Sequence, residues 1–370
     1  MNYREITLRD AIHFKNGKKR PASEGNIPVY GGNGVLGYAG ESNYEHCIII
    51  GRVGAYCGSV YLEEEKCWVS DNAIAAVPTG GNDIKFFYYL LKGLRLNERH
   101  IGTSQPLLTQ EILNKINCEV PSYPEQQRIA ELLGSLDRKI NVNQKLNDNL
   151  MQQAVTIFKS WFVEYSPFDG IEPKEWETVN LEKITSLISR GIAPKYSDNS
   201  DQIVINQKCI RNHMIDLSQA RTHTPKVINE KWLRFGDLLI NSTGDGTLGR
   251  AAQVWFQPQN ITVDSHVTVV RPAKENLIFY IGLWGVLHER EIESLHTGST
   301  GQTELPKERV KALELHLPDN GTLDRFNTLI APMAAAIVSK QNENNKLATL
   351  RDALLPKLMS GEIDVSAVQL

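Results

Sequence analysis

The chain has 370 residues, of which 41% are hydrophobic and 22% charged, and its mean hydropathy is −0.31. These values predict a globular protein of two or three domains, and no apolar run approaches the roughly 18 residues that a membrane span needs. Five cysteines without a Cys-x-x-Cys pair argue against a disulfide framework or a zinc site, so we expect reduced thiols and a cytoplasmic protein. A net charge of −3 does not by itself predict nucleic-acid binding.

Residues 1–101 are predicted to form a first globular domain. Basic residues cluster at Lys15, Lys18, Lys19 and Arg20, which is typical either of solvated surface or of a phosphate-binding patch. The segment 32–37 fits the G-x-G-x-x-G pattern of dinucleotide-binding loops, but the residues after it have turn chemistry instead of a helical pattern. We therefore interpret it as a glycine-rich turn, whose backbone N–H groups can contact phosphate.

Residues 102–165 are predicted to form a helical arm. Pro124 and Glu125 favour a helix start, because proline suits the first turn and an acid suits the positive end of the helix dipole. A heptad stripe of mostly apolar residues then runs from Ile129 to Trp161. Because Gly134 and the serine after it interrupt this stripe, we expect a short helix, a bend and a long helix of roughly 24 to 27 residues.

Residues 166–298 are predicted to form a second globular domain that repeats landmarks of the first. The run 239–241 resembles 49–51, and residues 264–267 resemble 71–74, so Asp264 is matched to Asp71. We interpret both aspartates as turn-stabilising residues. A second G-x-G-x-x-G segment, residues 244–249, precedes a strand-like run, which again argues against a dinucleotide site.

Residues 299–370 are predicted to form a second arm, which repeats the first at an offset of 197 residues. Gln105 falls on Gln302 and Arg128 on Arg325, and a matching stripe runs on to Leu358. So long a period excludes a solenoid and indicates a duplicated half-molecule. The interruption recurs at Ala331-Pro332, and the run 320–324 is turn-like, with a Thr or Asp cap expected.

The two stripes predict helices that pair along a coiled-coil seam. Asn143 and Asn147 in the first stripe, and Lys340 and Asn344 in the second, form a polar middle of the kind that fixes register. If the arms pair within one chain in antiparallel orientation, they generate a pseudo-two-fold axis. The alternatives are a coiled coil that dimerises two chains, or two ordinary core helices.

Three segments of the chain resemble one protein family. The run 157–168 (IFKSWFVEYSPF), continuing to Glu175-Trp176, is similar to the central conserved segment of the specificity subunits of Type I restriction-modification systems. Residues 350–363 (LRDALLPKLMSGEI) resemble that family's closing segment, and residues 121–128 (PSYPEQQR) resemble one of its recurring phrases. The second arm departs from the family pattern, because it lacks the Pro-x-Glu-Gln opening of the first.

This resemblance implies a mixed α+β fold with two target recognition domains, residues 1–101 and 166–298. The arms, residues 102–165 and 299–370, would form an intramolecular antiparallel coiled coil. Each recognition domain would read one half of a bipartite, asymmetric double-stranded DNA target, and the coiled coil would set the spacer. The family also implies docking of two methyltransferase subunits, which carry S-adenosylmethionine, and endonuclease/translocase subunits that complete the complex. The chain itself would have no cofactor and no catalytic role.

Candidate DNA-contacting residues are Arg, Lys, Asn and Gln side chains, since these make bidentate contacts to bases, together with small polar residues that contact phosphates. In the first domain they are Lys18, Lys19, Arg20, Asn33 and Arg52. In the second domain they are Lys195, Lys208, Arg211, Asn241 and Arg250. In the loops before the arms, where capping or domain packing is the competing interpretation, they are Thr103, Ser104, Gln105, Ser299, Thr300 and Gln302.

Two other classes of function remain as alternatives at this point. The first is a coiled-coil assembly protein without DNA specificity. The second, suggested only by the glycine motifs, is a dinucleotide-binding oxidoreductase. No P-loop, HExxH or G-x-S-x-G motif is present, and neither is the Asn-Pro-Pro-aromatic signature of amino-methyltransferases.

Overall fold

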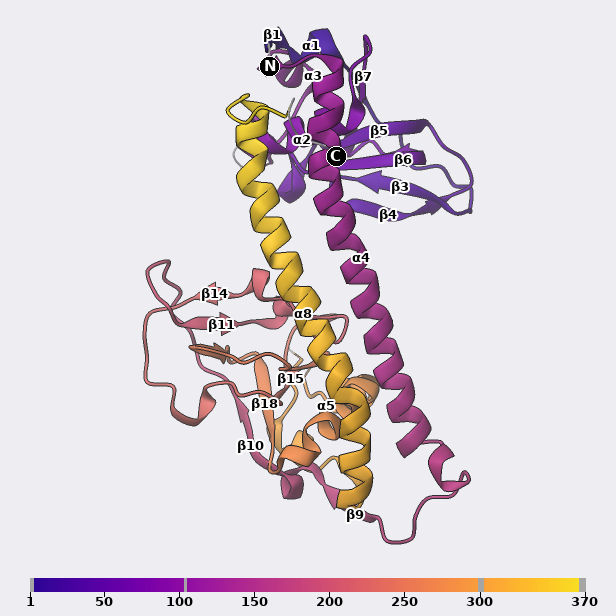
Figure 1. The fold of residues 1–370 in the computed structure, drawn as a ribbon, viewed down its shortest axis with the longest axis vertical. Helices are drawn as coiled ribbons and strands as arrows, with labels where there is room; N and C mark the ends of the chain where they lie inside the picture. The colour runs from indigo at the N-terminus through magenta and orange to yellow at the C-terminus, as the bar shows by residue number, and fades with distance from the viewer. Residues whose placement is uncertain (1–2, 103–104, 299–302, 366–370) are drawn as a thin grey trace. The chain divides into compact units, whose positions relative to one another are not determined.

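The computed structural model describes residues 3–102, 105–298 and 303–365 (Figure 1). The chain divides into two compact units, residues 1–141 with 343–370 and residues 142–342. Each unit combines a mixed α/β globule with one part of each of two long helices, α4 and α8, which confirms the predicted fold class. The predicted domain boundaries at residues 101, 165 and 298 stay predictions, because the two units divide within the helices.

The globule of the first unit is built on a six-stranded sheet with the strand order β2-β7-β5-β6-β3-β4. A separate antiparallel pair, β1-β8, and three short helices complete it. Its elements are β1 (Arg4–Thr7), α1 (Leu8–Ala11), β2 (Ile12–Asn16), β3 (Ile27–Gly31), β4 (Gly34–Ala39), β5 (Tyr44–Gly51), β6 (Val60–Val69), β7 (Ala73–Pro78), α2 (Ile84–Gly93), α3 (Gln110–Asn114) and β8 (Asn117–Val120).

The globule of the second unit is built on a four-stranded sheet with the order β10-β18-β15-β16. A three-stranded sheet, β14-β11-β17, the hairpin β12-β13 and the pair β19-β9 are added to it. Its elements are β9 (Glu177–Asn180), β10 (Thr185–Arg190), β11 (Ile203–Ile205), β12 (Ile210–Arg211), β13 (Met214–Ile215), β14 (Arg221–Thr222), β15 (Leu238–Asn241), β16 (Ala251–Gln253), β17 (Ile261–Val263), β18 (Val267–Pro272), α5 (Ile278–Leu287), α6 (Glu289–Ser294), α7 (Lys307–Lys311) and β19 (Glu314–Leu317).

The central strands β5 and β15 explain why the two sheets form where they do. In β5, Ile48 and Ile50 enter one apolar cluster while Cys47 and Ile49 enter another, so alternate residues bury opposite faces of the sheet. Strand β15 behaves in the same way, with Leu238 and Ile240 on one side and Leu239 on the other. A strand that is buried on both faces reads as a continuous apolar run, which is the pattern seen in both sequences.

The two globules share one framework of backbone hydrogen bonds. In the first unit Leu108 N donates to Arg52 O at 2.9 Å, and in the second Leu305 N donates to Ser242 O at 2.8 Å. The strand orders β2-β7-β5-β6 and β10-β18-β15-β16 correspond, with antiparallel pairing throughout. The predicted internal repeat is therefore confirmed in three dimensions.

One glycine in each framework is required by a close backbone approach. A Cβ on Gly17 would lie 2.0 Å from Ser70 O, and a Cβ on Gly191 would lie 2.0 Å from Val263 O. Both glycines donate their N–H to the first residue of the following framework strand, β7 or β18. No other residue fits this crossing without a backbone shift.

The long helices α4 (Tyr123–Phe162) and α8 (Asn320–Met359) are each continuous over 40 residues. The prediction of a short helix, a bend and a separate long helix is therefore wrong. Pro332 is exposed and lies between the buried residues Ile330 and Ala334, so its ring faces away from the seam. An interior proline costs about 3 kcal/mol, and the burial of an apolar stripe on both sides of it offsets that cost. Gly134 is buried, and a Cβ added to it would lie 3.9 Å from the Tyr89 hydroxyl.

Each long helix has an acidic N-terminal cap. Ser122 precedes α4, and its N–H and hydroxyl both donate to Glu125 at 3.0 and 2.9 Å. Asp319 precedes α8 and accepts from Thr322 N at 3.0 Å and from the Thr322 hydroxyl at 2.7 Å. The run 320–324, predicted to be turn-like with a Thr or Asp cap, is instead the beginning of α8, and the capping residue is Asp319 before it.

The predicted heptad stripes match the buried faces of both helices. None of the twenty stripe positions is exposed, and the polar middle residues Asn143 and Asn147 are buried. In α4 these positions are Ile129, Leu133, Leu136, Ile140, Asn143, Asn147, Leu150, Ala154, Ile157 and Trp161. In α8 they are Phe326, Ile330, Met333, Ile337, Lys340, Asn344, Leu347, Arg351, Leu354 and Leu358.

Contacts within the first unit show that α4 and α8 pair in antiparallel orientation. Arg351 forms an ion pair with Asp137 at 2.6 Å, and Asn344 Nδ2 donates to Ile140 O at 3.4 Å. Residues farther along α4 thus meet residues earlier along α8. Tyr89 of α2 donates to the same Asp137 at 2.7 Å, which joins the globule to both helices.

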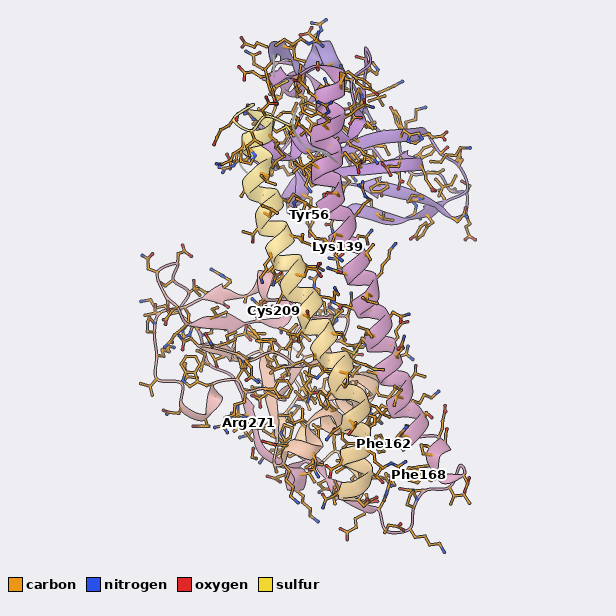
Figure 2. All side chains as sticks on the ribbon, in the orientation of Figure 1. Tyr56, Lys139, Phe162, Phe168, Cys209 and Arg271 are labelled. Carbon is orange, nitrogen blue, oxygen red and sulfur yellow. The ribbon has the colours of Figure 1, made fainter. Side chains whose placement is uncertain are left out.

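The second unit contains an aromatic cluster between the end of α4 and the start of α8. The Phe326 ring lies 4.8 Å from the Phe162 ring and 5.8 Å from the Trp161 ring, measured between centroids. Phe168 and Trp176, in the segment that follows α4, extend the cluster; Phe162 and Phe168 are labelled in Figure 2. The aromatic residues of the family-like run 157–168 therefore pack the end of α4 onto the second globule.

Candidate nucleic-acid interface

A polar groove of the second unit lies beside the turn between β15 and β16. This groove is lined by Gln207, Thr243, Gly244, Asp245, His266, Thr303 and Glu304. Gln207 Nε2 donates to Thr243 O at 2.6 Å, and the Thr243 hydroxyl lies 2.7 Å from His266 Nδ1. These bonds attach the turn to the short 3-10 helix at Gln207–Cys209 and to the start of β18.

A two-residue hairpin brings further polar residues to the same turn. Asn212 and His213, which join β12 to β13, both have positive φ, as the tight hairpin turns with matching twist require. His213 Nδ1 lies 3.2 Å from Glu289 Oε1, which also accepts from Ala251 N at 2.7 Å. Arg211, on β12, is thereby held near the start of β16.

The predicted contact residues of the second unit have different environments. Lys195, Lys208 and Arg211 are exposed, and their side chains have no hydrogen bond or ion pair with any described residue. Arg250 donates from Nη2 to Gly246 O at 2.9 Å, so its guanidinium is held against the turn. Asn241 is fully buried and its Nδ2 donates to Gln207 O at 3.3 Å, so its side chain packs the floor of the turn and cannot reach a base edge in this conformation.

The predicted contact residues of the first unit surround the β3–β4 hairpin and the end of β5. Lys18, Lys19 and Asn33 are exposed, with side chains unpaired within the described ranges. Arg20 Nη2 donates to Tyr38 O at 3.0 Å, and Arg52 Nη1 lies 3.5 Å from Asp71 O.

The glycine-rich segments are turns of β-hairpins in both units. Residues 32–33 join β3 to β4, and residues 242–250 join β15 to β16. No helix opens after either segment, so neither has the strand-turn-helix geometry of a dinucleotide site. The interpretation as glycine-rich turns and loops is confirmed, and contact of their backbone N–H groups with phosphate stays a prediction.

The matched aspartates need one correction. Lys18 bridges to Ser70 and Ile192 bridges to Asp264, so the framework equivalent of Asp264 is Ser70 and the sequence match to Asp71 is one residue out of register. Asp264 Oδ1 accepts from His266 N at 2.9 Å, which confirms its role in a turn. Burial raises the pKa of the Asp264 carboxyl.

The predicted residues in the loops before the arms are described only in part. Gln105 is exposed, whereas Thr103, Ser104, Ser299, Thr300 and Gln302 lie outside the described residues. Around these loops, Ile101 bridges to Leu107 in the first unit, and Thr297 bridges to Glu304 in the second.

Sequence reasoning missed three residues beside these turns. Asp245 and His266 line the groove of the second unit, and Tyr56, which is 51% exposed and labelled in Figure 2, lies on the corresponding turn of the first. The signal in the sequence is the similarity of residues 49–51 to residues 239–241, because each run leads into a turn that contains glycines. This similarity points to every residue of the two turns and not only to Arg, Lys and Asn.

The described residues contain no group of three or more His, Cys, Asp or Glu side chains that could hold a metal ion. Within the same residues, no helix is both long enough and apolar enough to cross a membrane.

The two globules share a backbone framework, and each carries exposed cations beside its turns. This arrangement is typical of a protein with two recognition domains. The family model for the Type I restriction modification DNA specificity domain matches the chain twice, at residues 2–152 and 173–331. Because these matches cover most of the chain, it belongs to the Type I restriction-modification specificity family and is the DNA-recognition subunit of such a complex.

Individual relatives agree with this assignment. The chain is 27% identical over 317 residues to the Type I restriction enzyme MjaIX specificity subunit of Methanocaldococcus jannaschii, covering 78% of this chain and 71% of that protein. It is 32% identical over 116 residues to the EcoprrI specificity subunit of Escherichia coli, covering 31% and 29%. The crystal structure of the S subunit from M. genitalium superposes with a TM-score of 0.60 at 16% identity, covering 97% of this chain and 96% of that one, which shows a shared fold.

Proposed function

We propose that this chain is a non-catalytic reader of a bipartite, asymmetric double-stranded DNA target, in which each unit reads one half. The observation that supports this most directly is the contrast between framework and turns. The two globules share four corresponding strands and their backbone hydrogen bonds, but the exposed turn at the end of β5 carries Val53 and Tyr56, whereas the turn at the end of β15 carries Thr243 and Asp245. A repeated scaffold with different exposed chemistry is what recognition of two different half-sites requires.

The charge distribution supports DNA as the ligand. The unpaired cations Lys18, Lys19, Lys208 and Arg211 lie beside the turns, although the whole chain has a net charge of −3. Unpaired Lys and Arg side chains are suited to phosphate contacts, which position a protein on the duplex without reading sequence. Arg250, whose guanidinium is held against Gly246 O, is suited to a base edge because a held guanidinium can make a bidentate contact. Arg211 is a second candidate base-reading residue, because the β12–β13 hairpin fixes its backbone and arginine is a common reader of guanine.

The direct experiment expresses the chain with its cognate methyltransferase in a host lacking modification and sequences the methylated bases. A bipartite target with two different halves is expected. The variant Arg211→Ala should relax one position of one half-site, whereas Lys208→Ala should weaken binding to all sequences and reduce the salt slope. An undivided target, or methylation without sequence preference, would contradict the proposal.

We further propose that α4 and α8 set the spacer between the half-sites. Both helices run without interruption through the residues at which the two units divide, and the polar positions in the middle of their stripes are of the kind that fixes register. Removing one heptad from each helix shortens both by about 10 Å, which corresponds to about three base pairs of DNA. The spacer should change while both half-sites keep their sequence. As a control, removal of a heptad from α4 alone should abolish methylation, because it puts the two stripes out of register.

The proposed partners are two methyltransferase subunits, which would carry S-adenosylmethionine, and endonuclease/translocase subunits. The cytoplasm is the compartment that this function requires, since the complex acts on cellular DNA. Purified chain supplied with S-adenosylmethionine and target DNA should transfer no methyl group, and added methyltransferase subunits should restore transfer. Methyl transfer by the chain alone would refute the non-catalytic assignment. Homo-oligomers without salt-dependent DNA binding, alone or with methyltransferase, would favour a coiled-coil assembly protein instead.

A further inference from the structure

The turns that follow β5 and β15 are built on equivalent backbone positions. Gly58 N donates to Gly51 O at 2.8 Å in the first unit, and Gly249 N donates to Asn241 O at 2.8 Å in the second. In each turn the residue before the first glycine bridges to the loop that leads into the following helical segment, and that glycine has positive φ. Cys57 N donates to Gly54 O and Thr247 N donates to Gly244 O, so the two turns correspond from the first glycine over the next three residues. Beyond that point the second turn is longer by one residue.

The side chains at these corresponding positions differ in chemistry. Ala55 follows the first glycine of one turn, and Asp245 follows the first glycine of the other. Both residues are exposed. An added Cβ on Gly246 would meet no atom within 4 Å, so the space around Asp245 is open on that side.

Asp245 is the unpaired acid of the groove in the second unit. The other acid that lines the groove, Glu304, forms an ion pair with Arg190. The Asp245 carboxylate has no hydrogen bond or ion pair with any residue in the described ranges. Beneath the turn, Asn241 Oδ1 is buried and also lacks a partner among the described residues, so the floor of this site has a free acceptor as well.

An unpaired carboxylate is unfavourable on a surface that binds phosphates. Lys208 and Arg211 are carried by the segments packed against the turn, and Arg250 is bonded to it, so cationic side chains are carried on and beside the turn that holds Asp245. A carboxylate placed there repels the DNA backbone unless a hydrogen-bond donor of the DNA meets it. In the major groove those donors are the exocyclic amino groups, N4 of cytosine and N6 of adenine.

We propose that Asp245 is a specificity-determining residue, which accepts a hydrogen bond from the exocyclic amino group of a cytosine or adenine in the half-site read by the second unit. This inference rests on the proposed function and adds the chemical identity of one base position. A guanine or thymine at that position would bring a carbonyl oxygen towards the carboxylate, so both are rejected. Ala55, at the corresponding place in the first unit, makes no such selection.

The test uses full-length Asp245→Ala and Asp245→Asn variants, each expressed with the cognate methyltransferase, and methylated bases are sequenced for each. Asp245→Ala should relax one position of one half-site, so that methylation of sites with guanine or thymine there rises about ten-fold or more relative to the preferred base. Asp245→Asn should move the preference at that position towards adenine, because asparagine makes a bidentate contact to adenine. The other half-site and the spacer should not change.

Glu275→Ala is the matched control. Glu275 is also an exposed acid of the second unit, but it follows the far end of β18, a six-residue strand of about 20 Å that starts beside His266 of the groove. This control should leave the target unchanged. If wild-type chain gives a bipartite target and both Asp245 variants give the same target, the inference is refuted and the proposed function stands. If the wild-type chain gives no bipartite target, the proposed function fails instead.

Discussion

Replacing Asp237 with alanine is expected to destabilise the second unit strongly, because it leaves a buried cation without its partner. Asp237 is fully buried and Arg271, labelled in Figure 2, is 6% exposed. Arg271 donates to the two carboxylate oxygens at 2.8 and 2.7 Å, and to Glu230 O and Trp232 O at 2.9 and 2.7 Å. The carboxylate also accepts from Arg234 N at 2.8 Å. The substitution removes three of these hydrogen bonds and the only opposing charge among the described contacts of Arg271.

Breaking a buried ion pair on one side costs about 3–5 kcal/mol. For a unit of this size, each kcal/mol shifts the melting temperature by about 2–4 °C, so a decrease of roughly 6–20 °C is expected. Intrinsic tryptophan fluorescence is the appropriate probe, since five of the six tryptophans lie in the second unit. Urea unfolding monitored in this way gives the free energy directly, provided the second unit unfolds in one transition.

Two further variants separate this explanation from a general effect of removing an acid. Glu164→Ala breaks an exposed ion pair of the same unit, with Lys159 at 3.2 Å, and should cost no more than about 1 kcal/mol. The double variant Asp237→Leu/Arg271→Met replaces both charges with apolar groups and should recover most of the loss. The reasoning is refuted if Asp237→Ala unfolds within about 1 kcal/mol of the wild type.

Three other outcomes are expected. Gly17→Ala and Gly191→Ala should each destabilise their own unit, seen as a lower urea midpoint, while Gly93→Ala should not, because its nearest contact for an added Cβ is 3.8 Å away. Asp137→Ala should reduce the stability of the first unit by about 1–3 kcal/mol, measured by circular dichroism, since it removes the shared partner of α2 and α8. Burial lowers the pKa of His223 in the folded protein, so protonation of this histidine favours the unfolded state and the wild type loses stability as the pH falls. His223→Leu removes this loss. The urea midpoint of the variant relative to that of the wild type should therefore be higher at pH 5 than at pH 7.5.

The framework could be predicted from the sequence because it is constrained twice. The stripe positions must be apolar or register-fixing in both arms, and the crossing glycines Gly17 and Gly191 must lack a Cβ in both globules, so each signal appears twice in the chain. The interruption at Pro332 was misjudged for a related reason. The low helix propensity of proline predicts a break in the helix at this position. Pro332 faces solvent, however, and the burial of Ile330 and Ala334 on either side of it keeps α8 continuous.

The surface residues that are proposed to read DNA are not constrained in this way, and for them the sequence predicts only the residue types. Asn241 has a suitable side chain for reading adenine, yet it ends a strand that is buried on both faces, which only the sheet reveals. Asp245 is not among the predicted residues, because the prediction of base contacts is based on Arg, Lys, Asn and Gln side chains. Its significance depends on three facts that no linear pattern contains: the surrounding cations, the ion pair that occupies Glu304, and the alanine at the corresponding position of the other unit. In a duplicated protein that distinguishes two half-sites, we therefore expect specificity at positions where the framework is equal and the chemistry is not.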